Sequence, residues 1–178
     1  FRALEHLYAQ GHRSIGFLRA ETEIGGLYSR YVAYRSRMQA FGLKVPEEHI
    51  LRIDPRYEVA VGQMQAYLQD KPSLPTAFLA ANDIIAAGCV RALQQAGYQV
   101  PGDVSIMGFD DGAMSTFVSP PLTTMRINRA RSGELAVERL VALHTIPNDV
   151  VVKSTLAVSL IERESTQPVS LENAADPV

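Results

Sequence analysis

The chain has 178 residues, of which 47% are hydrophobic and 20% charged, which is the composition of a folded domain with a sizeable core and excludes a disordered segment. Its formal net charge is −2 and no basic stripe is present, so we expect no direct binding of this chain to nucleic acid. The single cysteine, Cys89, excludes an intrachain disulfide framework, and no apolar run approaches the roughly 20 residues that span a membrane.

Helical and strand patterns alternate along the first two thirds of the chain. We expect helices at residues 2–9, 28–41, 58–69 and 83–95. We expect strands at residues 14–18, 50–53, 76–81 and 104–107, with a turn at Gly25 and Gly26. Strands separated by helices of three or four turns indicate an α/β fold, in which helices flank a parallel sheet. The chain starts at Phe1 inside a helical pattern, so we expect it to be a piece of a longer protein.

The regular alternation ends after Asp111. Pro120 and Pro121 force extended backbone, and a further strand is expected at residues 122–127, followed by a helix at residues 130–144. Two late strands are expected at residues 150–152 and 156–161. Beyond Gln167 the sequence is polar and contains proline, which predicts a loose tail.

Polar side chains stand where predicted strands end. Asp110 and Asp111 follow the fourth strand, and Asn82 follows the third. Arg30 lies near the start of the helix after the first strand, where a cation gains nothing from the helix dipole. Because ligands of open α/β sheets bind beyond the carboxyl ends of the strands, these side chains are candidates for one binding crevice.

Each candidate also has a plainer interpretation. The two aspartates suit Mg²⁺ and ligand hydroxyl groups equally, and the plainer alternative is that one of them caps the next segment. Asn82 is at least as well placed to cap a helix, and a solvated side chain is the commoner role of a single arginine such as Arg30. In favour of binding, three polar groups of different chemistry at one crevice suit a ligand rich in hydroxyl groups better than a substrate that reacts there.

Sequence motifs for catalysis, metals and cofactors are missing. The four histidines show no HxxxH or HExxH spacing, and no P-loop, GxGxxG or GxSxG pattern follows a strand. We therefore expect no metal site, no cofactor and no enzymatic activity.

Several short motifs occur together in an order typical of one protein family. They are Gly11-His12-Arg13-Ser14-Ile15, Ala81-Asn82-Asp83, Val100-Pro101-Gly102-Asp103-Val104-Ser105, Met107-Gly108-Phe109-Asp110-Asp111, Pro121-Leu122-Thr123-Thr124 and Leu160-Ile161-Glu162-Arg163-Glu164-Ser165-Thr166. From residue 2 to about residue 166 the chain resembles the effector-binding region of the lactose repressor (LacI) family of bacterial transcription regulators. That region has two lobes and is similar to periplasmic sugar-binding proteins of type I.

The resemblance implies a division of the chain. Residues 2–121 correspond to most of the C-terminal lobe, residues 122–150 cross to the N-terminal lobe, residues 151–166 return, and residues 167–178 form the tail. The N-terminal helix-turn-helix domain of the family, through which its members bind DNA, has no counterpart here, nor has the first part of the N-terminal lobe. A cytoplasmic regulator is implied, with no membrane partner.

The resemblance also assigns the ligand-binding residues. In the family an arginine early in the second helix, the asparagine of the Asn-Asp pair and the first aspartate of the Gly-Phe-Asp-Asp motif contact a small-molecule effector, here expected to be a sugar or a sugar derivative. These residues match Arg30, Asn82 and Asp110. The family pattern Arg-x-x-Gly departs here at Ala33, which is small enough to preserve close helix packing.

A homodimer is a further expectation. The helix at residues 83–95 is apolar around more of its surface than one sheet-facing stripe requires. Cover by another element of the same chain is the plainer explanation, whereas the family resemblance places a two-fold contact on its outer face. The implied contact residues are Ala87, Val90, Arg91, Gln94, Phe117 and Val118.

Two other functions compete with the regulator. A periplasmic sugar-binding component of a transporter shares the two-lobed architecture, although the Gly-Phe-Asp-Asp and Glu-Ser-Thr motifs favour the regulator. A Mg²⁺-dependent phosphotransfer enzyme would use Asp110 and Asp111, but such a receiver-like site also needs a lysine at another strand end, and none is present there.

Overall fold

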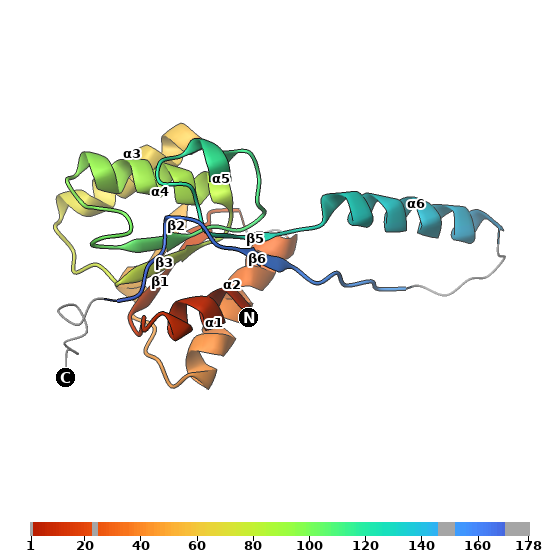
Figure 1. Cartoon of the computed structure of the whole chain (residues 1–178), viewed down its shortest axis with the longest axis horizontal. Coiled ribbons are helices and arrows are strands. Elements are labelled where there is room, and N and C mark those ends of the chain that lie inside the picture. The colour runs from red at the N-terminus through yellow and green to blue at the C-terminus, as the bar shows by residue number, and fades with distance from the viewer. Residues whose placement is uncertain (1, 23–24, 146–151, 170–178) are drawn as a thin grey trace.

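A computed structural model describes residues 2–22, 25–145 and 152–169. Its centre is a parallel sheet in the order β2-β1-β3-β4 (Figure 1). The strands are β1 (Ile15–Ala20), β2 (Ile50–Ile53), β3 (Ala77–Ala80) and β4 (Ser105–Met107). Every residue of β3 and β4 is buried, as the uninterrupted apolar runs predict for strands covered on both faces. The predicted parallel α/β sheet is confirmed.

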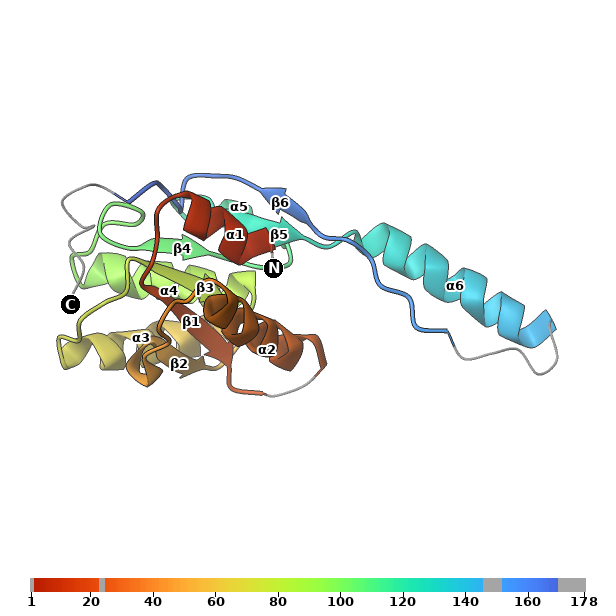
Figure 2. The same ribbon diagram turned by 90° about the horizontal axis from the view of Figure 1, so that it is seen from below.

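Two pairs of helices cover the sheet. The helices α3 (Tyr57–Gln69) and α4 (Asp83–Gln95) lie on one face, and α1 (Arg2–Ala9) and α2 (Gly25–Ala40) lie on the other (Figures 1 and 2). A short 3₁₀ turn, η1 (Glu47–His49), precedes β2. The expected turn at Gly25 and Gly26 is wrong, because both glycines belong to the first turn of α2, where Gly25 adopts a φ of 45°.

Close packing in the core depends on two glycines. A Cβ at Gly16 of β1 would lie 2.4 Å from the Phe78 ring, and a Cβ at Gly88 of α4 would lie 2.7 Å from the Ala60 Cβ on α3. Next to Gly16, the Tyr34 hydroxyl donates a hydrogen bond of 2.7 Å to the Ile15 carbonyl, which ties α2 to β1. Glycine therefore leaves room for the Phe78 ring beside β1 and for the close approach of α4 to α3.

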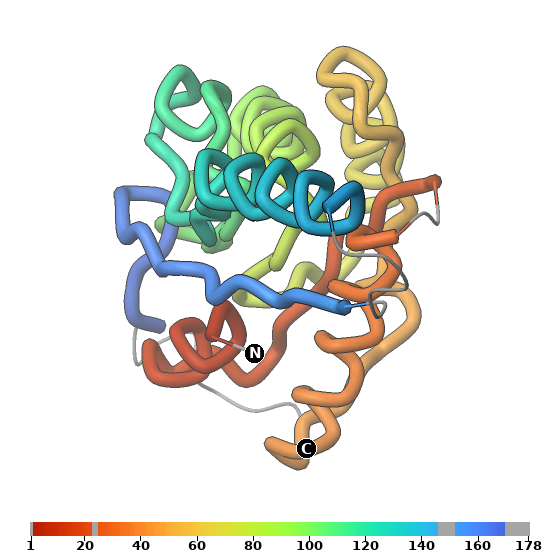
Figure 3. The backbone as a smooth tube through the Cα atoms, turned by 90° about the vertical axis from the view of Figure 1, so that its right-hand side faces the viewer, coloured from red at the N-terminus to blue at the C-terminus, as the bar shows by residue number. Residues whose placement is uncertain are grey.

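The second part of the chain leaves the sheet domain and comes back. After α5 (Met114–Phe117), strand β5 (Thr124–Arg126) leads out to α6 (Arg129–Thr145), and β6 (Ser159–Ile161) returns antiparallel to β5. The helix α6 stands apart from the sheet domain, and Figure 3 looks at the domain from the side of this helix. None of the described residues of α6 is buried.

The expected late strands are only partly present. The strand β6 is shorter than the expected range 156–161. Of the expected strand at residues 150–152, residues 150 and 151 lie outside the described residues, and Val152 is not in a strand. Within the described ranges no helix is long and apolar enough to cross a membrane.

The tail is bound further than expected. The Gln167 backbone N–H donates to Ser105 Oγ at 3.2 Å, and the Val169 N–H donates to the Gln10 carbonyl at 2.9 Å. These bonds attach residues 167–169 to β4 and to the end of α1, so the loose tail predicted from Gln167 onward does not begin there. Residues 170–178 lie outside the described residues.

Candidate functional site

Arg30 and Asp110 meet beyond the carboxyl ends of the parallel strands. The Arg30 Nη2 donates to Asp110 Oδ1 at 2.9 Å, and its Nη1 donates to the carbonyl of Ala81, just after β3, at 2.6 Å. The guanidinium carbon lies 3.9 Å from the centre of the Phe109 ring. Residues from α2, β3 and the end of β4 therefore converge, and the sequence had placed Arg30 and Asp110 at this edge.

The backbone of the aspartate pair is in an uncommon conformation. Asp110 has a φ of 111° and Asp111 a φ of 51°, which for residues other than glycine is tolerated best by aspartate and asparagine. The Asp110 N–H donates to the Met125 carbonyl at 2.9 Å, which holds this turn against β5. Such strain, fixed by surrounding bonds, is typical of functional sites.

Asn82 has the capping role that the sequence suggested, and its ligand-binding role stays a prediction. Its Oδ1 accepts a hydrogen bond of 2.9 Å from the Ile85 N–H, so it is the N-cap of α4. Its amide nitrogen donates to no group in the described part of the chain. Asn82 directly follows Ala81, whose carbonyl accepts a hydrogen bond from Arg30, so its backbone is next to the residue that binds Arg30.

Asp111 has a different role from Asp110. Its Oδ1 accepts from Arg163 Nη2 at 2.6 Å and from the Ser115 hydroxyl at 3.1 Å, and its Oδ2 accepts from Arg126 Nε at 2.5 Å. Partial burial raises the pKa of the Asp111 carboxyl, but the three hydrogen bonds outweigh burial and the pKa lies below its usual range. Arg126 and Arg163 were missed in the sequence, where only their positions beside β5 and β6 could have marked them.

Asp83 is a third carboxyl group behind the site. It accepts from the Thr124 hydroxyl at 2.6 Å and from the Gly112 N–H at 2.7 Å. Burial raises the pKa of this carboxyl, and the two hydrogen bonds offset the rise only in part. A Cβ at Gly108 would lie 2.2 Å from Asp83 Oδ1, so the exit from β4 requires glycine at this position.

The carboxylates are arranged for arginine and not for a metal ion. Both oxygens of Asp111 are taken up by guanidinium groups, and Asp110 faces Arg30. Among the residues that the structure describes, no group of three or more histidine, cysteine, aspartate or glutamate side chains is arranged to hold a metal.

The comparisons with known proteins identify the family. A model of the periplasmic binding protein-like domain matches residues 4–166. The ribose operon repressor of Escherichia coli (strain K12) is 31% identical over 163 residues, which cover 92% of this chain and 49% of the repressor. The chain belongs to the periplasmic-binding-protein-like domains of the LacI family. It spans about half the length of the curated relatives that it matches.

Solved structures of the LacI family agree with this assignment. A lac repressor dimer bound to operator and the anti-inducer ONPF has a TM-score of 0.83 and 29% identity. The matched region covers 93% of this chain and 56% of the lac repressor chain. A complex of the transcriptional regulator CelR with cellobiose has a TM-score of 0.82 and 27% identity. The matched region covers 90% of this chain and 49% of the CelR chain. The LacI-family relatives are transcriptional repressors and not enzymes, which leaves the phosphotransfer alternative without support.

The LacI-type dimer contact expected on α4 needs correction. Ala87 and Val90 are fully buried inside the chain, because α4 packs along α3 and α5 as well as the sheet. The plainer explanation, cover by the chain's own elements, is therefore right for these two residues. The other expected contact residues are exposed or half-buried: Arg91, Gln94, Phe117 and Val118. Phe117 is 81% exposed, and Gln94 Nε2 donates to the Ser119 carbonyl at 2.8 Å.

A hollow of about 520 Å³ lies at the other end of the sheet. It is lined by residues around the amino ends of β3 and β4, among them Leu74, Thr76, Tyr98 and Asp103. None of the sequence-predicted ligand residues contributes to it. The hollow is therefore separate from the edge that carries Arg30 and Asp110.

Proposed function

We propose that the chain is the ligand-sensing region of a cytoplasmic LacI-family transcriptional regulator, and that it binds a sugar or a sugar derivative through Arg30, Asn82 and Asp110. The observation that supports this most strongly is the convergence of Arg30 and Asp110 at the carboxyl edge of the sheet. Binding of the effector would control DNA binding by a helix-turn-helix domain that is not part of this chain.

The chemistry of the edge suits neighbouring hydroxyl groups. Asp110 is partly exposed and its Oδ2 remains available as an acceptor, while the Asn82 amide nitrogen and the remaining Arg30 N–H groups are donors. A sugar offers donors and acceptors on adjacent carbons, so it can bind a carboxylate and an arginine together. The CelR complex with cellobiose shows a sugar on a related regulator, which supports the same ligand class here.

The protruding segment fits a second lobe. The helix α6 exposes Val137, Leu140, Val141 and Leu143, each at least half accessible. An apolar face of this kind normally packs against another surface. We infer that residues 122–150 cross into an N-terminal lobe, that residues 151–166 return from it, and that the effector binds between the two lobes.

We further propose that the regulator is a homodimer. On the surface of α4 and α5, Arg91, Gln94 and Phe117 are exposed and Val118 is half-buried, and an 81% exposed phenylalanine favours burial against a partner. The similar lac repressor structure is a dimer, which supports a two-fold contact.

DNA binding by the full-length protein tests the proposal. The promoter region upstream of its own gene would be the DNA probe, and sugars and sugar derivatives would be added while fluorescence anisotropy is followed. The proposal predicts saturable DNA binding that one class of sugar changes. A protein that carries an export signal and binds sugar without binding DNA would instead support the transporter alternative.

A further inference from the structure

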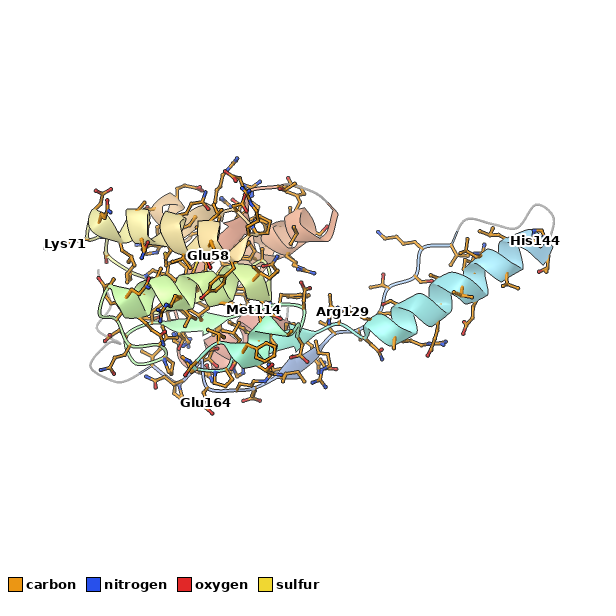
Figure 4. The ribbon with its side chains drawn as sticks, turned by 90° about the horizontal axis from the view of Figure 1, so that it is seen from above. Glu58, Lys71, Met114, Arg129, His144 and Glu164 are labelled. Carbon is orange, nitrogen blue, oxygen red and sulfur yellow. The ribbon has the colours of Figure 1, made fainter. Side chains whose placement is uncertain are left out.

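The guanidinium group of Arg129 is held at the candidate site without a carboxylate partner. Arg129 is the first residue of α6 and lies at the neck between the sheet domain and that helix (Figure 4). Its Nη2 donates to the Asp110 carbonyl at 2.8 Å, and its Nη1 lies 3.4 Å from the Asp111 carbonyl. Both acceptors are uncharged. In the described part of the chain, no carboxylate forms a salt bridge with Arg129.

Positive charge therefore exceeds negative charge around the aspartate pair. Four guanidinium groups surround it: Arg30, Arg126, Arg129 and Arg163. Asp110 and Asp111 supply two negative charges, so the positive charges exceed the negative ones by two. Counting the buried Asp83 as ionised still leaves an excess of one, and burial raises the pKa of Asp83, which favours its neutral form.

An uncompensated guanidinium becomes costly when a site closes. At the open edge of the sheet domain, Arg129 is exposed to solvent. Covering its guanidinium group by a ligand and a second lobe would remove it from solvent, and a charge without a counter-charge is then unfavourable. A carboxylate or a phosphate restores the balance and matches the planar donor fork of arginine in a bidentate way.

Asp110 places this cation beside the hydroxyl-binding groups. Its carboxylate binds Arg30, and its main-chain carbonyl binds Arg129, so the two guanidinium groups lie around one residue. We propose that the effector is an anionic sugar derivative whose carboxylate or phosphate binds Arg129 while its hydroxyl groups bind Asp110 and Asn82. This inference rests on the proposed sensing function and specifies its ligand class.

Inorganic phosphate is the first probe, because it tests the anion site without knowledge of the effector. Phosphate would be titrated into the full-length protein at constant ionic strength and followed by calorimetry. We expect saturable binding that is weakened about tenfold or more in Arg129→Gln, since a hydrogen bond to a charged group is lost. Arg131→Gln is the matched control, because Arg131 pairs with Glu134 and Glu138 on α6 and should leave phosphate binding unchanged. Absence of binding would overturn the proposal. Equal affinity in wild type and Arg129→Gln would also overturn it and would indicate an adventitious ion only.

Matched sugars then identify the anionic group. The set is ribose with ribose 5-phosphate, and glucose with glucose 6-phosphate and gluconate. We expect at least one anionic member to bind about tenfold tighter than its neutral parent, and Arg129→Gln to remove that difference. Preference for gluconate indicates a carboxylate, and preference for a sugar phosphate indicates a phosphate.

A neutral sugar that binds as tightly as its anionic derivatives and alters DNA binding would overturn the anion site and leave the sensing function standing. If phosphate binding depends on Arg129 but no sugar or sugar derivative alters DNA binding, the anion site stands and the proposed sensing function is overturned.

Discussion

Asp111 and Arg163 are 52 positions apart in the chain, yet the Arg163 Nη2 donates to Asp111 Oδ1 at 2.6 Å. The bond joins the end of β4 to the segment that follows β6. On its other oxygen Asp111 binds Arg126, at the end of β5. One carboxylate therefore links both strands of the crossover to the loop that carries Asp110.

Asp111→Asn is expected to destabilise the protein by about 1–3 kcal/mol at pH 7, because two arginine hydrogen bonds lose their charged acceptor. The pKa of Asp111 is lowered, so its stabilising effect is present above the unfolded pKa of an aspartate and is lost as the pH falls through the folded value. Urea unfolding at pH 7 and at pH 3 measures this, and the loss should shrink at the lower pH. The control is Asp54→Asn, whose partner Arg56 is exposed, and it should lose much less stability. Equal losses in the two variants would contradict the role of Asp111 in holding β5 and the segment after β6 together.

His12 predicts a second dependence on pH. Its Nδ1 lies 2.9 Å from Thr76 Oγ1, and its Nε2 lies 3.1 Å from the Gln167 carbonyl. Burial lowers the pKa of His12 to about 4, against the pull of the Gln167 carbonyl. The unfolded chain therefore binds a proton between about pH 6.5 and 4 that the folded chain does not, and stability falls as the pH is lowered. Between pH 7 and 5 we expect wild type to lose about 2 kcal/mol more than His12→Gln. Parallel stability profiles of the two proteins would show that His12 is not the titrating group.

Gly88 and Gly62 form a matched pair on the packed helices α4 and α3. A Cβ at Gly88 meets the Ala60 Cβ at 2.7 Å, whereas a Cβ at Gly62 meets nothing within 4 Å. Gly88→Ala should therefore lower the free energy of unfolding by about 1–3 kcal/mol through overpacking. Gly62→Ala should raise the free energy of unfolding by about 0.5–1 kcal/mol, because alanine is the better helix former. Thermal unfolding of the two variants decides, and changes of the same sign would contradict the close approach of the helices.

Phe117→Glu tests the proposed dimer. Phe117 is 81% exposed, so the substitution should separate the subunits through charge repulsion across the two-fold axis and leave the fold intact. Val90→Glu cannot serve, because Val90 is fully buried and a buried glutamate would unfold the domain. Light scattering at several concentrations should give a dimer for wild type and for Gln39→Glu, an exposed position on α2, and a monomer for Phe117→Glu. A dimer that tolerates Phe117→Glu would place the contact elsewhere.

The sequence predicted the fold well because the apolar runs and their glycine and proline boundaries act locally. It also placed Arg30 and Asp110 at one edge of the parallel sheet, where the structure brings them together. Their ligand-binding role, and that of Asn82, stays a prediction. It failed at Val90, where an apolar helix face indicated a partner but not which one, and α3 and α5 of the same chain cover it. It also missed the separate role of Asp111, because Arg126 and Arg163 reach it only after β5 and β6 have paired. Long-range pairing of this kind leaves no local pattern.

The most direct test of the sensing edge is the ligand affinity of Asp110→Asn. Asparagine preserves the size of the side chain and tolerates the positive φ of this position, so the fold should be unaffected. Calorimetric titration of the full-length protein with the sugar derivative that alters its DNA binding should show an affinity reduced about 10- to 100-fold, because a charged acceptor is lost. Asp103→Asn, at the opposite end of the sheet, should bind like wild type. Wild-type affinity in Asp110→Asn would contradict the proposal that the effector binds at the carboxyl edge beside Arg30.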